Sequence, residues 1–503
     1  MLVVPLCILY FLVLGVLSLY GFHRLHLVLL CRRHRARIGQ APALAGPPLG
    51  DDELPQVTVQ LPIFNESTVV QRLIRHVSRM DYPRGRLEIQ VLDDSTDETS
   101  ALARAEVARL RSRGFDAVYL HRDERVGYKA GALDEGLRRA KGGLVAIFDA
   151  DFIPRPDFLR SLVGHFRDPK VAMVQARWAH LNRDASLLTR IQALMLDGHH
   201  LVENRARYGA GLLFNFSGTG GMWRCAAIED AGGWQHDTVT EDLDLSYRAQ
   251  LRGWKFIYRE DVVSPAELPE DMAAVRMQQY RWAKGTVQTA RKLLRTVLRS
   301  RLRFAQRIEA LFHLTPHFAY PLMVALSLLM LPVLLAVTAK DATTLLLVDL
   351  PLGLAPMGSL AAFYMGAEAA QGRSRWGALK LLPALIALGV GLAPYLTQGV
   401  RAGLRERAGE FVRTPKHGVD RRRYWCHSEL PLMELGCGVV TACSVVVALQ
   451  TGHWLAAPFA ALFTLGYGCV AWLLLSERVA RRVGAPVPAE SATDVAGGAA
   501  SRA

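Results

Sequence analysis

Two carboxylates separated by one residue, Asp149 and Asp151, directly follow an apolar stretch of the chain. Hard divalent cations such as Mg²⁺ or Mn²⁺ prefer oxygen ligands, and Mg²⁺ usually takes one or two carboxylates together with substrate phosphates. Turns also favour Asp for capping reasons alone. We therefore consider Asp149 and Asp151 candidate ligands of a divalent metal that also contacts a diphosphate. Lys129 could add positive charge near that diphosphate, although a Lys at a helix start is usually only solvated.

A second acidic motif, Thr240-Glu-Asp-Leu-Asp244, predicts the start of a helix that continues through Leu251. Thr is a suitable N-cap, and acids in the first turn interact favourably with the helix dipole. That structural role explains the acids collectively. If one of them faces a cleft, it could instead act as a general base and take the proton from an attacking hydroxyl.

Polar residues also follow two predicted strands, in Leu61-Pro-Ile-Phe-Asn-Glu66 and in Asp93-Asp-Ser-Thr-Asp97. Carboxylates and amides at these strand ends can bind a nucleoside base and ribose. Asp97 and Asn65 could equally cap the helices that follow them. Taken alone, these two segments support both interpretations.

The segment Gln278-Gln-Tyr-Arg-Trp282 combines an aromatic face with a guanidinium group. Trp can stack on a sugar ring, and Arg can neutralise a departing diphosphate through two hydrogen bonds. An Arg-Trp pair near a membrane could also belong to an interfacial aromatic belt. In the basic segment Phe411-Val-Arg-Thr-Pro-Lys416, a mobile loop bearing Thr414 and Lys416 could close over a nucleotide diphosphate, or simply contact anionic lipid.

The elements that must position these residues include short β-branched runs that alternate with amphipathic helices. The predicted strands are Val57–Ile63, Leu87–Leu92, Ala117–Leu120 and Leu144–Phe148. Strands separated by helix-length segments predict βαβ units and a mostly parallel sheet, and therefore an α/β fold. Ligands of such sheets bind beyond the carboxyl ends of the strands, which is where Asp93, Asp94 and Asp149 fall.

Apolar residues make up 51% of the 503-residue chain and concentrate at its two ends. Residues 2–20 read as a membrane anchor, because their positive charge follows the apolar run and ends at Arg37. Further apolar segments occupy about 316–337, 343–366, 378–396, 430–449 and 454–475. The net charge of +14 includes Arg clusters beside these segments. We interpret the clusters as cytoplasmic membrane borders, and so expect a lipid bilayer and no nucleic acid as partner.

The distribution of basic residues suggests that the apolar segments after residue 300 do not all cross the bilayer. Suppose that all three apolar segments between residues 300 and 400 crossed the bilayer. The linker 397–429, which contains eight Lys or Arg and four acidic residues, would then lie on the outer side of the membrane. The positive-inside rule argues against that. We predict that 378–407 contains an interfacial or re-entrant helix. The expected units are an anchor at 1–37, a linker at 38–55, a catalytic domain at 56–300, interfacial and membrane helices at 301–475 with a cytoplasmic loop near 408–420, and a disordered cytoplasmic tail at 476–503.

Four ordered motifs resemble the D, DxD, TED and Q-x-x-R-W signature of processive family 2 glycosyltransferases, a group that includes cellulose synthase, hyaluronan synthase and cellulose-synthase-like glucomannan synthases. They are Asp93-Asp94, Asp149-Ala-Asp151, Thr240-Glu-Asp242 and Gln278-x-x-Arg-Trp282. The resemblance extends over about 56–416. The segments 90–97 and 251–256 resemble plant-type mannan and xyloglucan-backbone synthases and their bacterial relatives.

The resemblance implies a GT-A domain inserted between transmembrane helices, with a nucleotide diphospho-sugar donor and Mg²⁺ or Mn²⁺ as cofactor. It implies Asp242 as general base and Arg281 as pyrophosphate contact. The implied donor-binding residues are Glu66, Asp93, Asp94, Lys129, Asp149, Gln278, Thr414 and Lys416, with Asp149 and Asp151 on the metal. The implied acceptor-binding residues are Trp282, Ser217, Gly218 and Thr219. Segment 411–416 resembles the gating loop of cellulose synthase.

The function we expect is inverting transfer of a hexose, from UDP-glucose or GDP-mannose, to a growing β-linked glycan. The catalytic domain would face the cytoplasm at a bacterial inner membrane. One alternative is transfer of a single sugar to a polyprenyl phosphate or other lipid. Another is an inert membrane scaffold or transporter on the same domain, against which the intact carboxylates argue. The motifs identify neither the donor sugar nor accessory export subunits.

Overall fold

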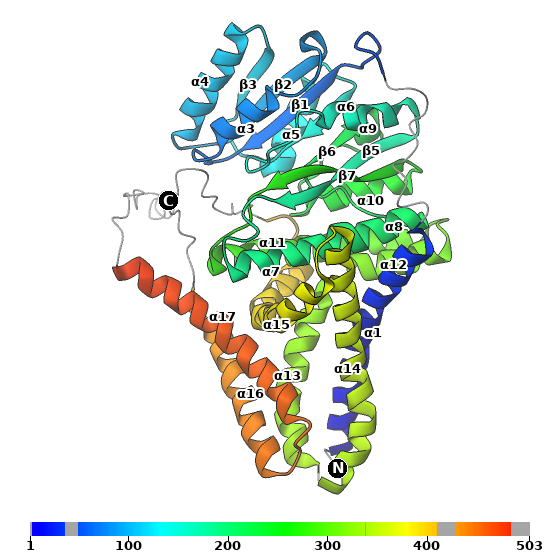
Figure 1. The fold of residues 1–503 in the computed structure, drawn as a ribbon, viewed down its shortest axis with the longest axis vertical. Helices are drawn as coiled ribbons and strands as arrows, with labels where there is room; N and C mark the ends of the chain where they lie inside the picture. Colours follow the sequence, from blue (N-terminus) through cyan, green and yellow to red (C-terminus); the bar gives the residue numbers. More distant parts are fainter. Residues whose placement is uncertain (1–2, 36–48, 338, 410–428, 484–503) are drawn as a thin grey trace, which may run out of the picture.

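A computed structural model describes residues 3–35, 49–337, 339–409 and 429–483. Its upper part contains a seven-stranded sheet with the order β3-β2-β1-β4-β6-β5-β7 (Figure 1). The four predicted strands are present as β1 (Val57–Ile63), β2 (Leu87–Asp93), β3 (Asp116–His121) and β4 (Leu144–Ile147). Sequence patterning missed β5 (Val171–His180), β6 (Gly221–Arg224) and β7 (Lys255–Ala266). Only β6 pairs antiparallel, with β4 and β5, so the predicted α/β class with a mostly parallel sheet is confirmed.

Helices cover the sheet and bury its central strands completely. They are α3 (Val70–Val77), α4 (Thr99–Ser112), α5 (Tyr128–Arg138), α6 (Phe158–Val163), α9 (Cys225–Asp230) and α10 (Glu241–Leu251). Every residue of β1 and β2 is buried. Parallel strands covered by helices on both faces consist of continuous apolar runs. These runs are the reason that β1 and β2 could be predicted from the sequence. The sheet therefore holds the loops at its carboxyl edge on a rigid base.

The folded domain starts earlier than residue 56, the boundary expected from the sequence. Leu54 is only 1% exposed. Arg86 donates a hydrogen bond of 2.6 Å to the Leu54 carbonyl, and the Tyr82 hydroxyl donates one of 2.6 Å to the Pro55 carbonyl. The end of the predicted linker is therefore part of the domain, because its apolar side chain and its carbonyls find partners there.

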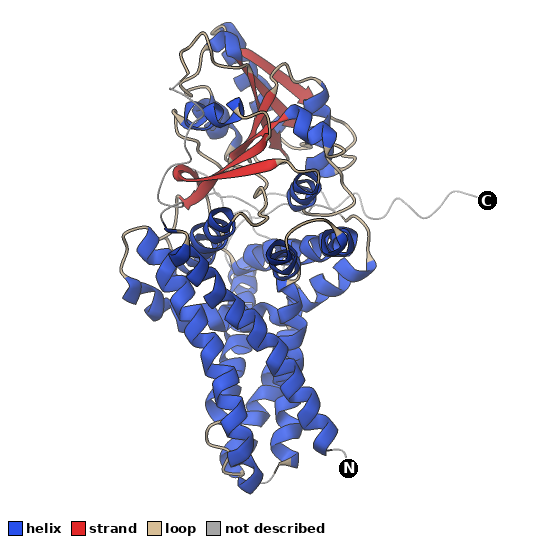
Figure 2. Ribbon diagram, turned by 90° about the vertical axis from the view of Figure 1, so that its right-hand side faces the viewer, coloured by secondary structure: helices blue, strands red, loops and turns tan. Residues whose placement is uncertain are grey.

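A layer of crosswise helices separates the sheet from the lower helical part (Figure 1). It contains α7 (Leu187–Gly198), α8 (Arg205–Ala210), α11 (Met272–Arg299) and α12 (Phe304–Leu314), and a π-helix, His199–Asn204, connects α7 to α8. Below it, α1 (Val3–Arg33), α13 (Ala319–Ala336), α14 (Ala339–Ala370), α16 (Leu432–Gln450) and α17 (Ala457–Val483) extend away from the sheet (Figures 1 and 2). Among the described residues, five helical stretches are long and apolar enough to cross a membrane: 3–33, 316–336, 375–405, 432–450 and 457–480.

Helix α15 (Arg375–Arg405) differs in orientation from the lengthwise helices. Figure 1 shows it foreshortened beside α7, while α13, α14, α16 and α17 run lengthwise. It packs against α11 and α17 and contains Pro383 and Pro394. Its composition alone also permits a membrane span. The interfacial or re-entrant segment at 378–407 remains a prediction, and the loop predicted near 408–420 falls mainly on residues outside the described part.

The predicted tail boundary at residue 476 is wrong. Helix α17 continues to Val483, and the Glu477 carboxylate accepts hydrogen bonds from the backbone amides of Met272 and Ala273, at 2.5 and 3.2 Å. These amides are the first of α11, where a negative charge interacts favourably with the helix dipole. Residues 476–483 are therefore ordered by contact with α11, and 484–503 lie outside the described residues.

A buried ion pair connects α11 to α16. Arg276 Nη2 lies 3.1 Å from Glu434 Oε1, and the two side chains are 6% and 0% exposed. The Arg276 guanidinium also stacks over the Tyr395 ring of α15, with its carbon 3.8 Å from the ring centre. A buried charge without its partner is far more costly than the intact pair. This contact therefore fixes α11 against two helices of the membrane part.

We predict that Arg276→Leu destabilises the protein by about 3–5 kcal/mol, because it leaves the Glu434 carboxylate buried without a counter-charge. The double variant Arg276→Leu/Glu434→Leu should lose much less stability than the single one. Thermal unfolding in detergent measures both. Arg295→Leu, an exposed change on the same helix, is the matched control. Equal losses in the single and double variants would contradict the role of the ion pair.

Candidate active site

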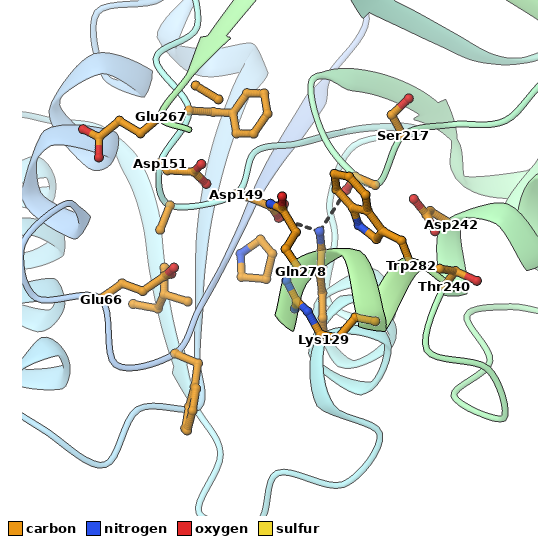
Figure 3. Close-up of a pocket in the computed structure, with 18 of the residues that line it drawn as sticks. Glu66, Lys129, Asp149, Asp151, Ser217, Thr240, Asp242, Glu267, Gln278 and Trp282 are labelled. Atoms are coloured by element: carbon orange, nitrogen blue, oxygen red, sulfur yellow. Dashed lines mark hydrogen bonds and ion pairs between the residues drawn. The ribbon is translucent and has the colours of Figure 1, made fainter. Parts of the chain in front are cut away.

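A cavity of about 200 Å³ opens at the carboxyl edge of the sheet, between the strand ends and α11. Eleven of the residues predicted from the sequence line it: Glu66, Asp94, Lys129, Asp149, Asp151, Ser217, Gly218, Asp242, Gln278, Arg281 and Trp282. Most of them are visible in Figure 3. Asp93 and Thr219 do not line the cavity, and Thr414 and Lys416 lie outside the described residues. The motifs scattered along the chain therefore converge on one place.

Lys129 bridges the acidic turn after β4 and the loop before β6. Its Nζ lies 2.5 Å from Asp149 Oδ1 and donates a hydrogen bond of 3.0 Å to the Gly218 carbonyl (Figure 3). Burial acts to lower the pKa of Lys129, but the nearby carboxylates of Asp149 and Glu241 outweigh it and raise the pKa. Lys129 therefore stays a cation inside the cavity.

Thr219 supports the acidic turn from behind. Its hydroxyl accepts a hydrogen bond of 2.9 Å from the Asp149 amide and donates one of 3.3 Å to the Ile147 carbonyl. Gln175 donates to the Thr219 carbonyl at 3.1 Å and accepts from the Ser217 amide at 2.9 Å. Thr219, predicted to bind acceptor, thus has a positioning role in the described structure.

The donor set at Asp149 and Asp151 suits a hard divalent cation shared with a substrate. Within the described ranges, no group of three or more His, Cys, Asp or Glu side chains is arranged to hold a metal ion. Two carboxylates facing a cavity meet the usual requirement of Mg²⁺, which takes its remaining ligands from phosphates and water. The side chains present therefore fit a metal that arrives with a diphosphate.

Helix α10 presents Glu241 and Asp242 to the cavity from its first turn. The helix predicted at this motif is confirmed, but the expected cap at Thr240 is not formed. The Thr240 hydroxyl instead lies 3.2 Å from the Thr289 hydroxyl of α11. The backbone amide of Leu243 donates a hydrogen bond of 2.8 Å to Asp242 Oδ1, which fixes one oxygen of that carboxylate.

The environment of Asp242 disfavours its charge. Burial, and next the charge of the adjacent Glu241, raise the pKa of Asp242 to about 7. Burial also raises the pKa of Glu241, although Lys129 opposes it. A base is most effective when its pKa lies near the working pH, because it is then both ionised and a good proton acceptor. Asp242 therefore has the properties of a general base.

The loop before β6 passes very close to this carboxylate. Gly218 has φ of +80°, in the left-handed region, and a Cβ built on it would lie 3.0 Å from Asp242 Oδ2. A side chain here would be strained and would also press on the Asp242 carboxylate. The contact explains why the chain turns at a glycine between Ser217 and Thr219.

One face of α11 closes the cavity. Three residues of α11 have the i, i+3, i+4 spacing that places side chains on one side of a helix. They are Gln278, Arg281 and Trp282, and all three line the cavity. In the view of Figure 3, the Trp282 ring lies between Asp149 and Asp242. The alternative of an interfacial aromatic belt is therefore wrong for Trp282.

The predicted nucleotide contact Asp93 is itself held by hydrogen bonds from neighbouring residues. Asp93 is fully buried and accepts hydrogen bonds from the Tyr119 hydroxyl at 2.6 Å and from the Ser95 amide at 2.9 Å. Burial acts to raise the pKa of Asp93, but hydrogen bonds from Ser100, Ser95 and Tyr119 outweigh it and lower the pKa. Asp93 therefore shapes the site from behind the cavity wall.

Several cavity residues were missed by sequence reasoning. Arg122 does not line the cavity itself, but it binds both oxygens of the wall residue Asp94, at 2.7 and 2.6 Å. It directly follows β3, so its position at a strand end could have identified it. Arg125 stacks over Phe64, with its guanidinium carbon 3.4 Å from the ring centre. The other missed wall residues include Trp178, His180 and Glu267. They belong to β5 or follow β7, the strands that patterning did not identify.

Comparison with known proteins agrees with the geometry. Residues 55–285 match the family model described as glycosyltransferase like family 2. This region is a family 2 glycosyltransferase domain. Its mixed sheet and covering helices are the GT-A fold of that family, and apolar helices flank it in the chain. The expected fold class and family resemblance are thus confirmed.

Two curated plant relatives each match about half of the chain. Glucomannan 4-beta-mannosyltransferase 2 of Arabidopsis thaliana is 45% identical over 270 residues, covering 52% of this chain and 51% of the relative. Glucomannan 4-beta-mannosyltransferase 1 of Oryza sativa subsp. japonica is 44% identical over 260 residues, covering 51% and 50%. The chain thus spans about half the length of the curated relatives it matches.

A solved structure, the mannosyltransferase PcManGT from Pyrobaculum calidifontis in complex with GDP-Man and Mn²⁺, is 23% identical. It aligns with a TM-score of 0.48 over 78% of this chain and 99% of its own.

We predict that Asp242→Asn raises the melting temperature, and more so at pH 8 than at pH 5. The folded state holds the Asp242 proton up to a pKa of about 7, whereas the ordinary value is 3.8. Folding therefore opposes ionisation, and its cost grows as pH rises from about 4 to 7. Asn removes that cost. Thermal unfolding at the two pH values measures it.

Asp244→Asn, on the same helix, is the matched control. Asp244 is fully buried and pairs with Arg248 at 2.8 Å and with Lys292 at 2.9 Å, so its neutralisation should lower the melting temperature. A lower melting temperature for Asp242→Asn at both pH values would show that its carboxylate is not strained by burial.

Proposed function

We propose that the protein is an inverting glycosyltransferase, embedded in a membrane, that moves a hexose from a nucleotide diphospho-sugar to a growing β-linked glycan. One observation carries the proposal. A single cavity contains three kinds of group. They are a carboxylate with the pKa of a base (Asp242), an aromatic ring (Trp282), and charged side chains of the types that bind a diphosphate directly or through a metal (Lys129, Asp149 and Asp151). These are the parts that a displacement at an anomeric carbon requires.

In the proposed reaction, an acceptor sugar stacks on Trp282 with one hydroxyl directed at Asp242. The carboxylate takes the hydroxyl proton as the oxygen attacks the anomeric carbon from the face opposite the diphosphate. The new glycosidic bond forms while the bond to the diphosphate oxygen breaks, which inverts the configuration. Lys129 and Arg281 stabilise the negative charge on the departing nucleotide. A divalent cation held by Asp149 and Asp151 would neutralise further charge on the same diphosphate.

For the donor we propose GDP-mannose over UDP-glucose, because the curated relatives are named as mannosyltransferases. The metal is Mg²⁺ or Mn²⁺. The Arg clusters beside the apolar helices favour a cytoplasmic catalytic domain, at a bacterial inner membrane. The acceptor is a glycan that passes among the helices, and the segment with Thr414 and Lys416 would close over the nucleotide. These assignments form one testable scheme.

The central test incubates membranes containing the protein with a panel of radiolabelled nucleotide sugars and digests the product with β-mannanase or β-glucanase. We expect incorporation from GDP-mannose that β-mannanase releases and that a metal chelator abolishes. Asp242→Asn should lose at least about a hundredfold in rate, the usual contribution of a general base. Normal transfer by Asp242→Asn at saturating donor would refute the assigned mechanism.

The rate should also depend on pH in a defined direction. Asp242 must be ionised to accept a proton, and burial raises its pKa to about 7. The value of kcat/KM should therefore fall about tenfold per pH unit below 7, because the ionised fraction falls by that factor. A rate that stays flat from pH 7 to pH 5 would assign the base to another group.

The alternative product is a single sugar on a polyprenyl phosphate or another lipid, which would extract into organic solvent. The position of Trp282 favours the glycan, because an aromatic platform suits a sugar ring. We expect Trp282→Ala to lose transfer but to bind the nucleotide sugar normally, while Trp282→Phe retains part of the transfer. Full activity of Trp282→Ala with an organic-soluble product would instead support the lipid acceptor.

A further inference from the structure

His180 is a polar residue in the cavity wall that belongs to none of the four motifs. It ends β5, and Trp178 lies two residues before it on the same face of the strand. Leu196 of α7 and Pro269, in the connection from β7 to α11, form the wall beside them. Because α7 is one of the crosswise helices, this side of the cavity adjoins that layer (Figure 1).

A buried carboxylate holds the His180 ring. His180 Nε2 lies 3.1 Å from Asp197 Oδ1, and the two side chains are 5% and 2% exposed. Burial acts to raise the pKa of Asp197, but the hydrogen bond and charge of His180 outweigh it and lower the pKa. Asp197 is therefore ionised and can only accept, so the proton lies on Nε2. Because Asp197 engages Nε2, a hydrogen bond from the ring to a sugar hydroxyl would involve the other nitrogen, Nδ1.

The membrane part fixes this pair in place. Arg373, in the turn between α14 and α15, donates a hydrogen bond of 2.6 Å to Asp197 Oδ2 and also binds Glu368 at 2.7 Å. Glu368 in turn lies 3.3 Å from Arg183. The chain of charges runs from a helical turn of the membrane part to the wall of the cavity. It leaves the His180 ring little freedom to rotate.

The neighbouring aromatic residue is equally rigid. Trp178 Nε1 donates a hydrogen bond of 3.3 Å to the Thr219 carbonyl. Its ring centre lies 5.2 Å from that of Phe152 and 5.3 Å from that of His200. A fixed aromatic surface beside a fixed polar group can bind the faces and the hydroxyls of a pyranose together.

We propose that His180 forms a hydrogen bond with one hydroxyl group of a pyranose in the cavity and so determines which sugar is accepted, with Asp197 and Arg373 as positioning residues. The inference rests on the proposed function. The hydroxyl belongs either to the sugar of the donor or to the terminal sugar of the acceptor glycan, since both must meet in this cavity. A site that hydrogen-bonds a substrate hydroxyl discriminates strongly against the sugar that lacks it.

The test is a thermodynamic cycle between the protein and the sugar. The full-length wild type and His180→Ala are each assayed with GDP-mannose analogues lacking one hydroxyl in turn, and separately with acceptor oligosaccharides deoxygenated in turn at the terminal residue. For one of these sugars the wild type should lose roughly tenfold or more in kcat/KM, while His180→Ala loses nothing further. The set in which this occurs identifies the donor or the acceptor as the partner of His180.

Three variants separate this role from a structural one. His180→Gln keeps a polar side chain and should recover part of the discrimination. His165→Gln, which changes another buried His hydrogen-bonded to Arg259 and away from the cavity, should leave the sugar preference unchanged. Asp197→Asn should weaken the same preference as His180→Ala, because it loosens the ring. The melting temperatures and elution volumes of all variants show whether they fold.

The outcomes distinguish this inference from the proposed function. If the wild type is active and every deoxygenated sugar loses the same factor in wild type and His180→Ala, the assignment of His180 is wrong while the proposed function stands. If the wild type transfers no sugar from the whole panel of nucleotide donors, the proposed function fails, and the assignment of His180 fails with it.

Discussion

The contact between Lys129 and Asp149 is the interaction on which the candidate site depends. It joins three segments that are distant in sequence, because Lys129 also donates to the Gly218 carbonyl. The cation at the start of α5 thereby connects the acidic turn after β4 to the loop before β6. Without a cation here, the carboxylates of Asp149, Glu241 and Asp242 would repel one another inside a poorly hydrated cavity. The arrangement holds them together while leaving Asp242 hard to ionise.

The sequence was most informative where one physical rule dominated. Strands β1, β2 and β4 are buried on both faces, so their apolar runs and the carboxylates after them could be read directly. Strands β5 and β7 could not be read in this way. The second half of β5 is only half-buried, and the apolar pattern of β7 is interrupted by charged residues, as in Arg259-Glu-Asp261. Their places in the sheet come from tertiary pairing, which no local pattern records.

The same difference explains the site residues. Four of the predicted residues belong to short motifs whose residue types indicate a particular chemistry, and all four line the cavity. They are Asp149, Asp151, Asp242 and Trp282. Asp93 and Thr219 stand in equally clear motifs but lie behind the wall, because a motif does not specify which way a side chain points. His180 and Arg122 carry no motif. Their roles arise from partners, Asp197 and Asp94, that only the fold brings near.

The membrane part also helps to set the position of Asp242. Helix α10 carries Asp242 in its first turn and Tyr247 about one and a half turns later. The Tyr247 hydroxyl lies 2.8 Å from His313 of α12. Helix α12 also carries Glu309, which accepts a hydrogen bond of 2.9 Å from Arg207 and lies 2.8 Å from His23 of α1. Buried polar chains of this kind are rigid, because each unsatisfied member would be costly. Asp242 is therefore held by the N-terminal apolar helix as well as by the sheet. A domain cut free of its helices would keep every motif and yet lose part of the geometry around Asp242.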